Sequence, residues 1–271
     1  MLFKNILLAV DVDGTLLNDE AVIPDNNVRA INEFREGGGL FTIATGRATS
    51  YSRNIALELD IDIPTIVYNG AMVYDFKNEK KLWQCVLPHK AREYLSHIIQ
   101  RYPTLGVDVL YDDDIYSIST NYQHDKHKRM IGTPVIKCSM ADLPDVCFNK
   151  MLLIDESDVI DSLYEYSFEL DLEGVNITRS SPHFFEILPD NANKGLGLEK
   201  IVELCGFEDY YIVTAGDYIN DIEMIRVADL GVAVENALDE VKAVADIVVC
   251  DNNGGAIYEV VEYLKSGRKK S

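Results

Sequence analysis

The chain has 271 residues, and 47% of them are hydrophobic, which is enough for one large domain or for two modest domains with their own cores. Asp and Glu number 45 against 25 Lys and Arg, so the net charge is −20. A surface this acidic argues against general nucleic-acid binding and against docking on anionic membranes, but it leaves an anionic small substrate possible, because a metal ion can reverse the field inside a cleft.

The first predicted strand is the apolar run that ends at Val10. Asp11 follows it directly, Asp13 comes two residues later, and Gly14 and Thr15 allow the chain to turn. Ligands of parallel α/β sheets bind beyond the carboxyl ends of the strands. Strand alternation would point both aspartates to one side, where they repel unless a cation separates them or one holds a proton. The pattern therefore fits a metal site or a nucleophile beside an acid, although an ordinary acidic turn would look similar.

Helices and strands then alternate along the chain. The sequence predicts a capped helix near 24–36, a strand at 40–44, a helix at 50–59 and a strand at 65–68. This alternation favours an α/β fold with a doubly wound parallel sheet. The polar residues that follow the second and third strands are Thr45, Gly46, Arg47, Asn69 and Gly70. A hydroxyl and backbone amides near a helix start, as at Thr45, can hold a phosphoryl oxygen.

The pattern changes near residue 73. Predicted strands come in consecutive pairs, at 107–111 and 115–119 and again at 175–178 and 184–188, and helices lie between them. This favours an inserted α+β cap domain with a mostly antiparallel sheet, which we place at 85–183 between core segments 1–84 and 184–271. His124 and His127 have helical spacing, but no third metal ligand is visible, so we interpret them as a surface pair.

The alternation resumes at Asn193-Lys194-Gly195, with helices predicted at 197–205 and 237–245 and a strand at 210–215. Asp217 again places an acid at a strand end. Taken alone, Lys194 would be a solvated lysine and Asn220-Asp221 a helix cap.

Four motifs stand in order: Asp11-x-Asp13-x-Thr15, Thr45-Gly46-Arg47, Lys194, and Asp217-x-x-Asn220-Asp221. In this order and context they resemble the haloacid dehalogenase-like (HAD) superfamily of phosphohydrolases, in particular its Cof-type branch, which carries a large α+β cap between the second and third motifs. The resemblance covers essentially the whole chain. One departure is Val232 to Asn236, where the family commonly has Met-Gly-Asn after the alanine, and Glu235 adds charge there.

The resemblance implies roles for these residues. Asp11 would be the nucleophile that forms an aspartyl-phosphate, and Asp13 would be the general acid and base. The metal would be Mg²⁺, a hard cation that prefers oxygen ligands. The implied metal residues are Asp11, Asp13 through its carbonyl, Asp217 and Asp221. Thr45 and Lys194 would bind phosphoryl oxygens. The implied substrate-binding residues are Gly46, Arg47, Asn69, Gly70 and Asn220, and the cap would choose the leaving group.

The expected partner is a small phosphate ester, without nucleic acid or membrane, and the oligomeric state stays open. Sugar phosphates, flavin mononucleotide and pyridoxal phosphate are substrates in the resembled family. A phosphomutase on the same core, a non-catalytic binding module and a dehalogenase proper are the alternatives. Five scattered cysteines without a Cys-x-x-Cys pair favour reduced thiols in a cytoplasmic protein.

Overall fold

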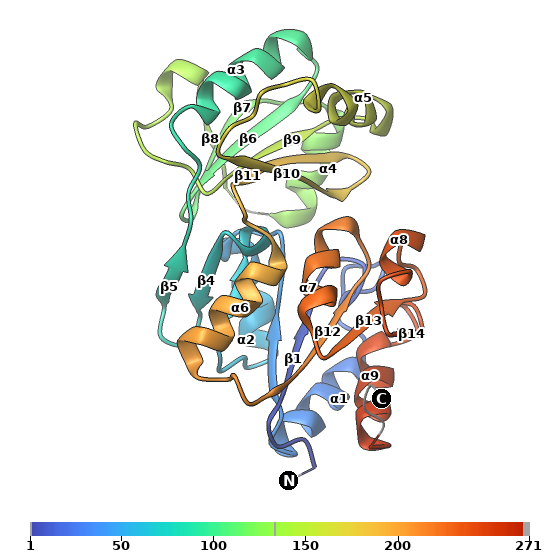
Figure 1. The fold of residues 1–271 in the computed structure, drawn as a ribbon. Coiled ribbons are helices and arrows are strands. Elements are labelled where there is room, and N and C mark those ends of the chain that lie inside the picture. Colours follow the sequence, from blue (N-terminus) through green and yellow to red (C-terminus); the bar gives the residue numbers. More distant parts are fainter. Residues whose placement is uncertain (1, 133, 268–271) are drawn as a thin grey trace. The chain divides into compact units, whose positions relative to one another are not determined.

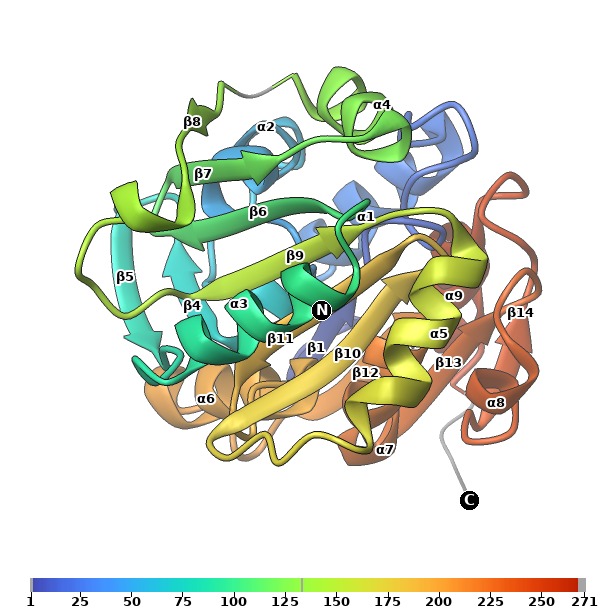
Figure 2. The ribbon, with the colours of Figure 1, turned by 90° about the horizontal axis from the view of Figure 1, so that it is seen from above.

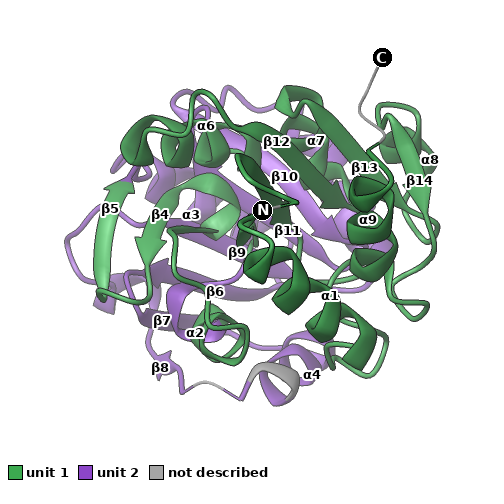
Figure 3. Cartoon of the chain, turned by 90° about the horizontal axis from the view of Figure 1, so that it is seen from below, with its two compact units in different colours: residues 1–46, 52–83, 193–271 green, residues 47–51, 84–192 purple. Residues whose placement is uncertain are grey.

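The computed structural model describes residues 2–132 and 134–267, and the chain forms two compact units (Figure 1). The first unit combines the segment up to residue 46 with 52–83 and the segment from 193 onward, and the second combines 47–51 with 84–192 (Figure 3). The boundary that the sequence predicts after residue 183 falls between two strands that pair with each other. Residues 184–192 therefore group with the second unit.

The first unit is built on a five-stranded parallel sheet in the order β14-β13-β12-β1-β2. Its strands are β1 Ile6–Val10, β2 Leu40–Ile43, β12 Tyr211–Gly216, β13 Leu230–Val234 and β14 Ile247–Val249. Every residue of β1 and β13 is buried, as expected for parallel strands that are covered on both faces.

Two helix pairs cover the faces of this sheet. On one face α1 (Asp25–Glu36) lies beside α9 (Ala256–Lys265), and on the other α6 (Lys194–Cys205) lies beside α7 (Ile222–Val227) (Figures 2 and 3). The prediction of a doubly wound sheet is thereby confirmed. Every helix among the described residues is too short or too polar to cross a lipid bilayer.

The strand order reverses between β1 and β12, because the chain continues from β1 to β2 on one side and from β12 to β13 and β14 on the other. Such a switch point is where open α/β sheets bind ligands.

The remaining elements of residues 49–84 and 219–242 are α2 Thr49–Glu58, β3 Thr65–Val67, the 3-10 turn Tyr68–Gly70, β4 Met72–Asp75, β5 Lys80–Gln84, the 3-10 turn Ile219–Asp221 and α8 Asp239–Lys242.

The second unit contains a six-stranded sheet in the order β10-β11-β9-β6-β7-β8, antiparallel except for the β7–β8 pair. Its elements are α3 Ala91–Arg101, β6 Gly106–Tyr111, β7 Asp114–Ser119, α4 Tyr122–Ile131, β8 Ile136–Lys137, the 3-10 turn Met140–Asp142, β9 Lys150–Ile154, α5 Ser157–Ser167, β10 Val175–Ser181 and β11 Phe184–Pro189. Apolar residues of α3, α5 and one face of this sheet form a core of their own. The prediction of an additional α+β sheet is confirmed.

Helix α4 lies on the opposite face of this sheet, where it is anchored by His124. Asp108 alternates with the core residues Val107 and Val109, and His124 Nε2 donates to Asp108 Oδ1 at 2.8 Å. His124 is completely buried, so the prediction of a surface histidine is wrong for this residue. A Cβ at Gly106 would lie 2.5 Å from His124 Cβ, so the glycine makes room for the ring.

Candidate active site

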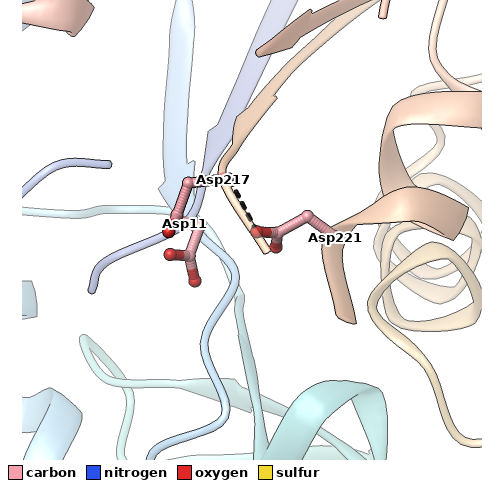
Figure 4. Close-up of side chains that lie close together, drawn as sticks. All are labelled: Asp11, Asp217 and Asp221. Atoms are coloured by element: carbon pink, nitrogen blue, oxygen red, sulfur yellow. Dashed lines mark hydrogen bonds between the residues drawn. The ribbon is translucent and has the colours of Figure 1, made fainter. Parts of the chain in front are cut away.

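The carboxylates of two motifs meet where the two central strands end. Asp11 directly follows β1 and Asp217 directly follows β12, and the pairing of these strands continues as Asp11 N donates to Ala215 O at 2.9 Å. Asp221 closes the 3-10 turn after β12. One oxygen from each of the three aspartates lies within 4.8 Å of the others, and their side chains converge (Figure 4).

Lys194 supplies the positive charge of this cluster. Its side chain is completely buried, and Nζ lies 2.6 Å from Asp221 Oδ1 and also donates to Asp11 Oδ1. Lys194 is the first residue of α6 because Asn193 caps the helix, its side chain accepting from Leu196 N at 2.8 Å. The helix that the sequence predicts from residue 197 therefore begins three residues earlier. Asn193 was not among the predicted site residues, although an asparagine before a helix start signals such a cap.

Three carboxylates lie around one ammonium, and this imbalance is visible in the pKa values of Asp11 and Asp217. Burial, reinforced by the charges of Asp221, Asp217 and Asp13, raises the pKa of Asp11 well above its usual 3.8 even though Lys194 opposes the rise. Burial and the nearby Asp221 charge raise the pKa of Asp217 to about 7. Burial by itself would lower the pKa of Lys194, but the two carboxylates that it contacts outweigh burial and raise it, so the lysine stays charged.

The loop after β1 is fitted closely against Asp217. Thr15 Oγ1 donates to Asp217 Oδ1 at 2.9 Å. Gly14 has φ +82°, and a Cβ there would lie 2.5 Å from Asp217 Oδ2, so this position requires glycine for conformation and for space. Asn236 Nδ2 donates to Gly14 O at 2.8 Å, a contact between residues 222 positions apart that local sequence patterns do not reveal. Glu235, the departure from the family pattern, is exposed, with Lys242 Nζ 3.5 Å away.

The donor set suits a hard divalent cation. Asp11, Asp217 and Asp221 offer carboxylate oxygens, which are the ligands that Mg²⁺ prefers, and their excess negative charge is what a cation would neutralise. Asp221 Oδ2 already accepts from the backbone amides of Asp217 and Tyr218, at 2.9 and 3.1 Å, so this side chain also holds the loop in place.

Asp13 differs from these buried side chains in its exposure. The strand ends at Val10, so the alternation from which we expected Asp11 and Asp13 to share a side does not extend to Asp13. Asp11 is buried and Asp13 is exposed. An exposed carboxylate near a buried one remains compatible with the predicted division between an acid and a nucleophile.

The second motif follows β2, the other neighbour of β1. Thr45 is completely buried, and its amide donates to Ile66 O at 2.9 Å. Gly46 and Arg47 are half-buried, and Arg47 belongs to the short segment 47–51 that groups with the second unit. Thr45 and Gly46 therefore lie in the first unit, at the same edge of the sheet as Asp11.

The third predicted loop is buried. Asn69 and Gly70 lie in the turn after β3, and Asn69 is only 1% exposed. Asn220 Nδ2 donates to Asn69 Oδ1 at 2.9 Å, so residues from two of the predicted sets meet here. Tyr68, Asn69 and Gly70 all have positive φ, of 53°, 53° and 89°. For the two non-glycine residues this conformation costs of the order of 1–3 kcal/mol each.

Comparison with known proteins agrees with this geometry. A family model described as haloacid dehalogenase-like hydrolase matches residues 8–261. The chain is 28% identical to the 5-amino-6-(5-phospho-D-ribitylamino)uracil phosphatase YwtE of Bacillus subtilis (strain 168), over 96% of this chain and 98% of the relative. It is 27% identical to the pyridoxal phosphate phosphatase YbhA of Escherichia coli (strain K12), over 94% of this chain and 97% of the relative.

A solved structure shares the fold along nearly its whole length. The HAD subclass IIB sugar phosphatase BT4131 superposes with a TM-score of 0.83 at 22% identity, and the match covers 95% of this chain and 98% of that one. The family that the four ordered motifs indicate is thus confirmed. The chain belongs to the haloacid dehalogenase-like hydrolases and is a phosphatase of that family.

Proposed function

We propose that the chain is a Mg²⁺-dependent phosphatase that hydrolyses small phosphorylated metabolites, sugar phosphates among them, through an aspartyl-phosphate on Asp11. The observation that carries this proposal is the buried cluster at the strand switch point, where Lys194 contacts both Asp11 and Asp221. A carboxylate oriented by an ammonium at this edge of the sheet is suited to attack phosphorus. All five cysteines are free thiols, which suits a reducing compartment, so we place the enzyme in the cytoplasm.

In the first step an Asp11 carboxylate oxygen attacks phosphorus, and the bond from phosphorus to the leaving oxygen breaks. Asp13 gives its proton to that oxygen. In the second step water attacks the phosphorus of the aspartyl-phosphate while Asp13 takes a proton from it, and inorganic phosphate leaves with Asp11 restored. Lys194 and Thr45 would hold the phosphoryl oxygens, where charge accumulates.

Asp11, Asp217 and Asp221, with the Asp13 carbonyl, are the groups that would hold Mg²⁺. Bound there, the ion would neutralise charge on the phosphoryl oxygens during transfer. A cation would favour the ionised form of Asp217, which burial and the Asp221 charge disfavour by raising its pKa. Thr15 would keep Asp217 oriented through the hydrogen bond to Oδ1.

The test is phosphate release from a panel of sugar phosphates, flavin mononucleotide and pyridoxal phosphate, with Mg²⁺ and with EDTA. We expect release with Mg²⁺, none with EDTA and inhibition by Ca²⁺, whose coordination is larger and looser. Borohydride reduction of the acid-quenched enzyme, followed by peptide mass spectrometry, should mark Asp11. The matched control is Asp209→Asn, an exposed aspartate, which should behave as the wild type. Full activity in EDTA would exclude the metal role, and transfer without phosphate release would indicate a mutase.

We further propose that the inserted segment 84–192 selects the leaving group. Lys150 Nζ and Glu186 Oε2 lie 2.7 Å apart, and Glu186 alternates with the core residues Phe185 and Ile187, so this charged pair lies on the sheet face that α3 and α5 do not cover. Both side chains are nearly fully buried, and charged groups held in place in this way suit a hydroxylated leaving group that binds at this face. Glu186→Gln should change the kcat/KM ratios among esters, and an equal loss for all esters would contradict the assignment.

A further inference from the structure

The turn Tyr68-Asn69-Gly70 has three consecutive residues with positive φ. All three residues are buried and have left-handed φ, which is uncommon for asparagine and an outlier for a bulky residue such as tyrosine. Strained backbone persists only where its surroundings determine it, and it gathers at functional sites. The contacts of this turn show what it holds.

One contact is with the loop of the second motif. Asn69 N donates to Thr45 O at 3.0 Å, and Thr45 N donates to Ile66 O at 2.9 Å, so Thr45 is hydrogen-bonded from β3 and from the turn. A Cβ at Gly46 would lie 2.8 Å from Asn69 Oδ1, so the Asn69 side chain packs directly on Gly46. Asn69 therefore contacts the backbone on both sides of the Thr45–Gly46 peptide bond and helps to fix its position.

The turn also contacts the loops of the third and fourth motifs. A Cβ at Gly70 would lie 1.9 Å from Asn193 O and 3.0 Å from Lys194 N, so the turn packs against the first residues of α6. Asn220 Nδ2 donates to Asn69 Oδ1 at 2.9 Å. Three chain segments that supply Thr45, Lys194 and Asn220 thus meet at one turn.

We propose that Asn69 is a positioning residue that fixes the spacing of Thr45, Lys194 and Asn220, instead of contacting the substrate as the sequence analysis predicts. The proposal rests on the phosphatase function proposed above. Because Thr45 and Lys194 hold the phosphoryl oxygens in that function, a displacement caused by loss of the Asn69 side chain affects the phosphoryl site, which all substrates share. A residue that touches the leaving group would instead affect different esters differently.

The test uses Asn69→Gly, Asn220→Ala and the double variant. Glycine adopts the left-handed conformation readily, so Asn69→Gly removes the side chain while the turn is retained. We expect kcat/KM to fall about tenfold to a hundredfold, as for small displacements of positioned groups, by the same factor for esters with different leaving groups. The double variant should lose little more kcat/KM than either single variant, because both single variants remove the same hydrogen bond, the one between Asn220 Nδ2 and Asn69 Oδ1.

The matched control is Asn5→Gly, the same change at an exposed left-handed asparagine that precedes β1, far along the strand from Asp11; it should leave kcat/KM unchanged. Unequal losses among esters, additive losses in the double variant, or unchanged kcat/KM in Asn69→Gly would each overturn the proposal. A purely structural role would lower the melting temperature and leave kcat/KM per folded molecule unaltered. If Asn69→Gly does not fold, Asn220→Ala must still show the uniform loss. Absence of hydrolysis in the wild type would instead overturn the proposed function.

Discussion

The raised pKa of Asp217 predicts a stability that depends on pH in a stated direction. In the folded chain this carboxyl has a pKa of about 7, against a usual 3.8, mainly because it is buried and secondly because Asp221 lies nearby. Between these values the folded state keeps a proton that the unfolded state has lost. The contribution of Asp217 to the free energy of unfolding is therefore fully present below pH 3.8 and is lost as the pH rises through 7.

The size of the effect follows from the same values. Each pKa unit corresponds to about 1.36 kcal/mol, so the rise from 3.8 to about 7 sets an upper bound of roughly 4 kcal/mol on the lost free energy of unfolding. The steepest fall is about 1.36 kcal/mol for each pH unit. Added Mg²⁺ should restore stability above pH 7, since it binds the ionised carboxylates of the folded state, and about 2.7 kcal/mol is expected at a hundredfold excess over Kd.

The assay is urea unfolding of the chelated protein at several pH values from 4 to 8, for the wild type and for Asp217→Asn. Asparagine keeps the shape of the side chain and removes its titration. As the pH rises from 4 to 8, the unfolding free energy of the wild type should therefore fall relative to that of Asp217→Asn, and the difference should level off above this range. Asp209→Asn, at an exposed position, serves as the control and should follow the wild type. A difference between wild type and Asp217→Asn that stays constant with pH would refute the reasoning.

Three further substitutions test other parts of the structure. Asp11→Asn should reduce kcat by at least about a thousandfold with KM largely kept, because the covalent step is lost; more than about a tenth of the activity remaining in a phosphate-release assay would exclude Asp11 as nucleophile. Gly14→Ala would place a Cβ 2.5 Å from Asp217 Oδ2, so the Mg²⁺ concentration for half-maximal activity should rise severalfold in a metal titration, and an unchanged curve would contradict this. Gly106→Ala should crowd His124 and lower the free energy of unfolding in urea by about 1–3 kcal/mol; an unshifted midpoint would show that α4 can adjust freely.

The sequence was most informative where a short apolar run ended in a polar residue. The strands β1 and β12 could be predicted because a parallel strand that is buried on both faces contains few polar residues and therefore appears as an apolar run. Asp11 and Asp217 follow these runs directly. Local patterns also showed where an antiparallel sheet begins. Both signals depend only on neighbouring residues, so no knowledge of distant contacts was needed.

Features that depend on distant contacts were not predictable in this way. The burial of His124 depends on Asp108 and on the space at Gly106, neither of which a helical spacing reveals. The lone Lys194 could be connected with Asp11 only through the order of the motifs, since 183 residues separate the two partners of that hydrogen bond. The left-handed turn at Asn69 left no mark in the sequence beyond an Asn-Gly pair.

The order in which the chain is synthesised gives the central pair of strands a further consequence. β1 pairs along its whole length with β12, and the second unit's continuous segment 84–192 lies between them in the chain. That segment has its own core, and we expect it to fold before β12 has been synthesised, since domains generally fold as units during synthesis. β1 must wait for a partner made much later, and closing so long a loop is slow. A nascent or truncated chain that lacks β12 has neither Asp217 nor a neighbour on that side of β1, so we expect phosphatase activity to arise only after β12 and Asp217 have been synthesised.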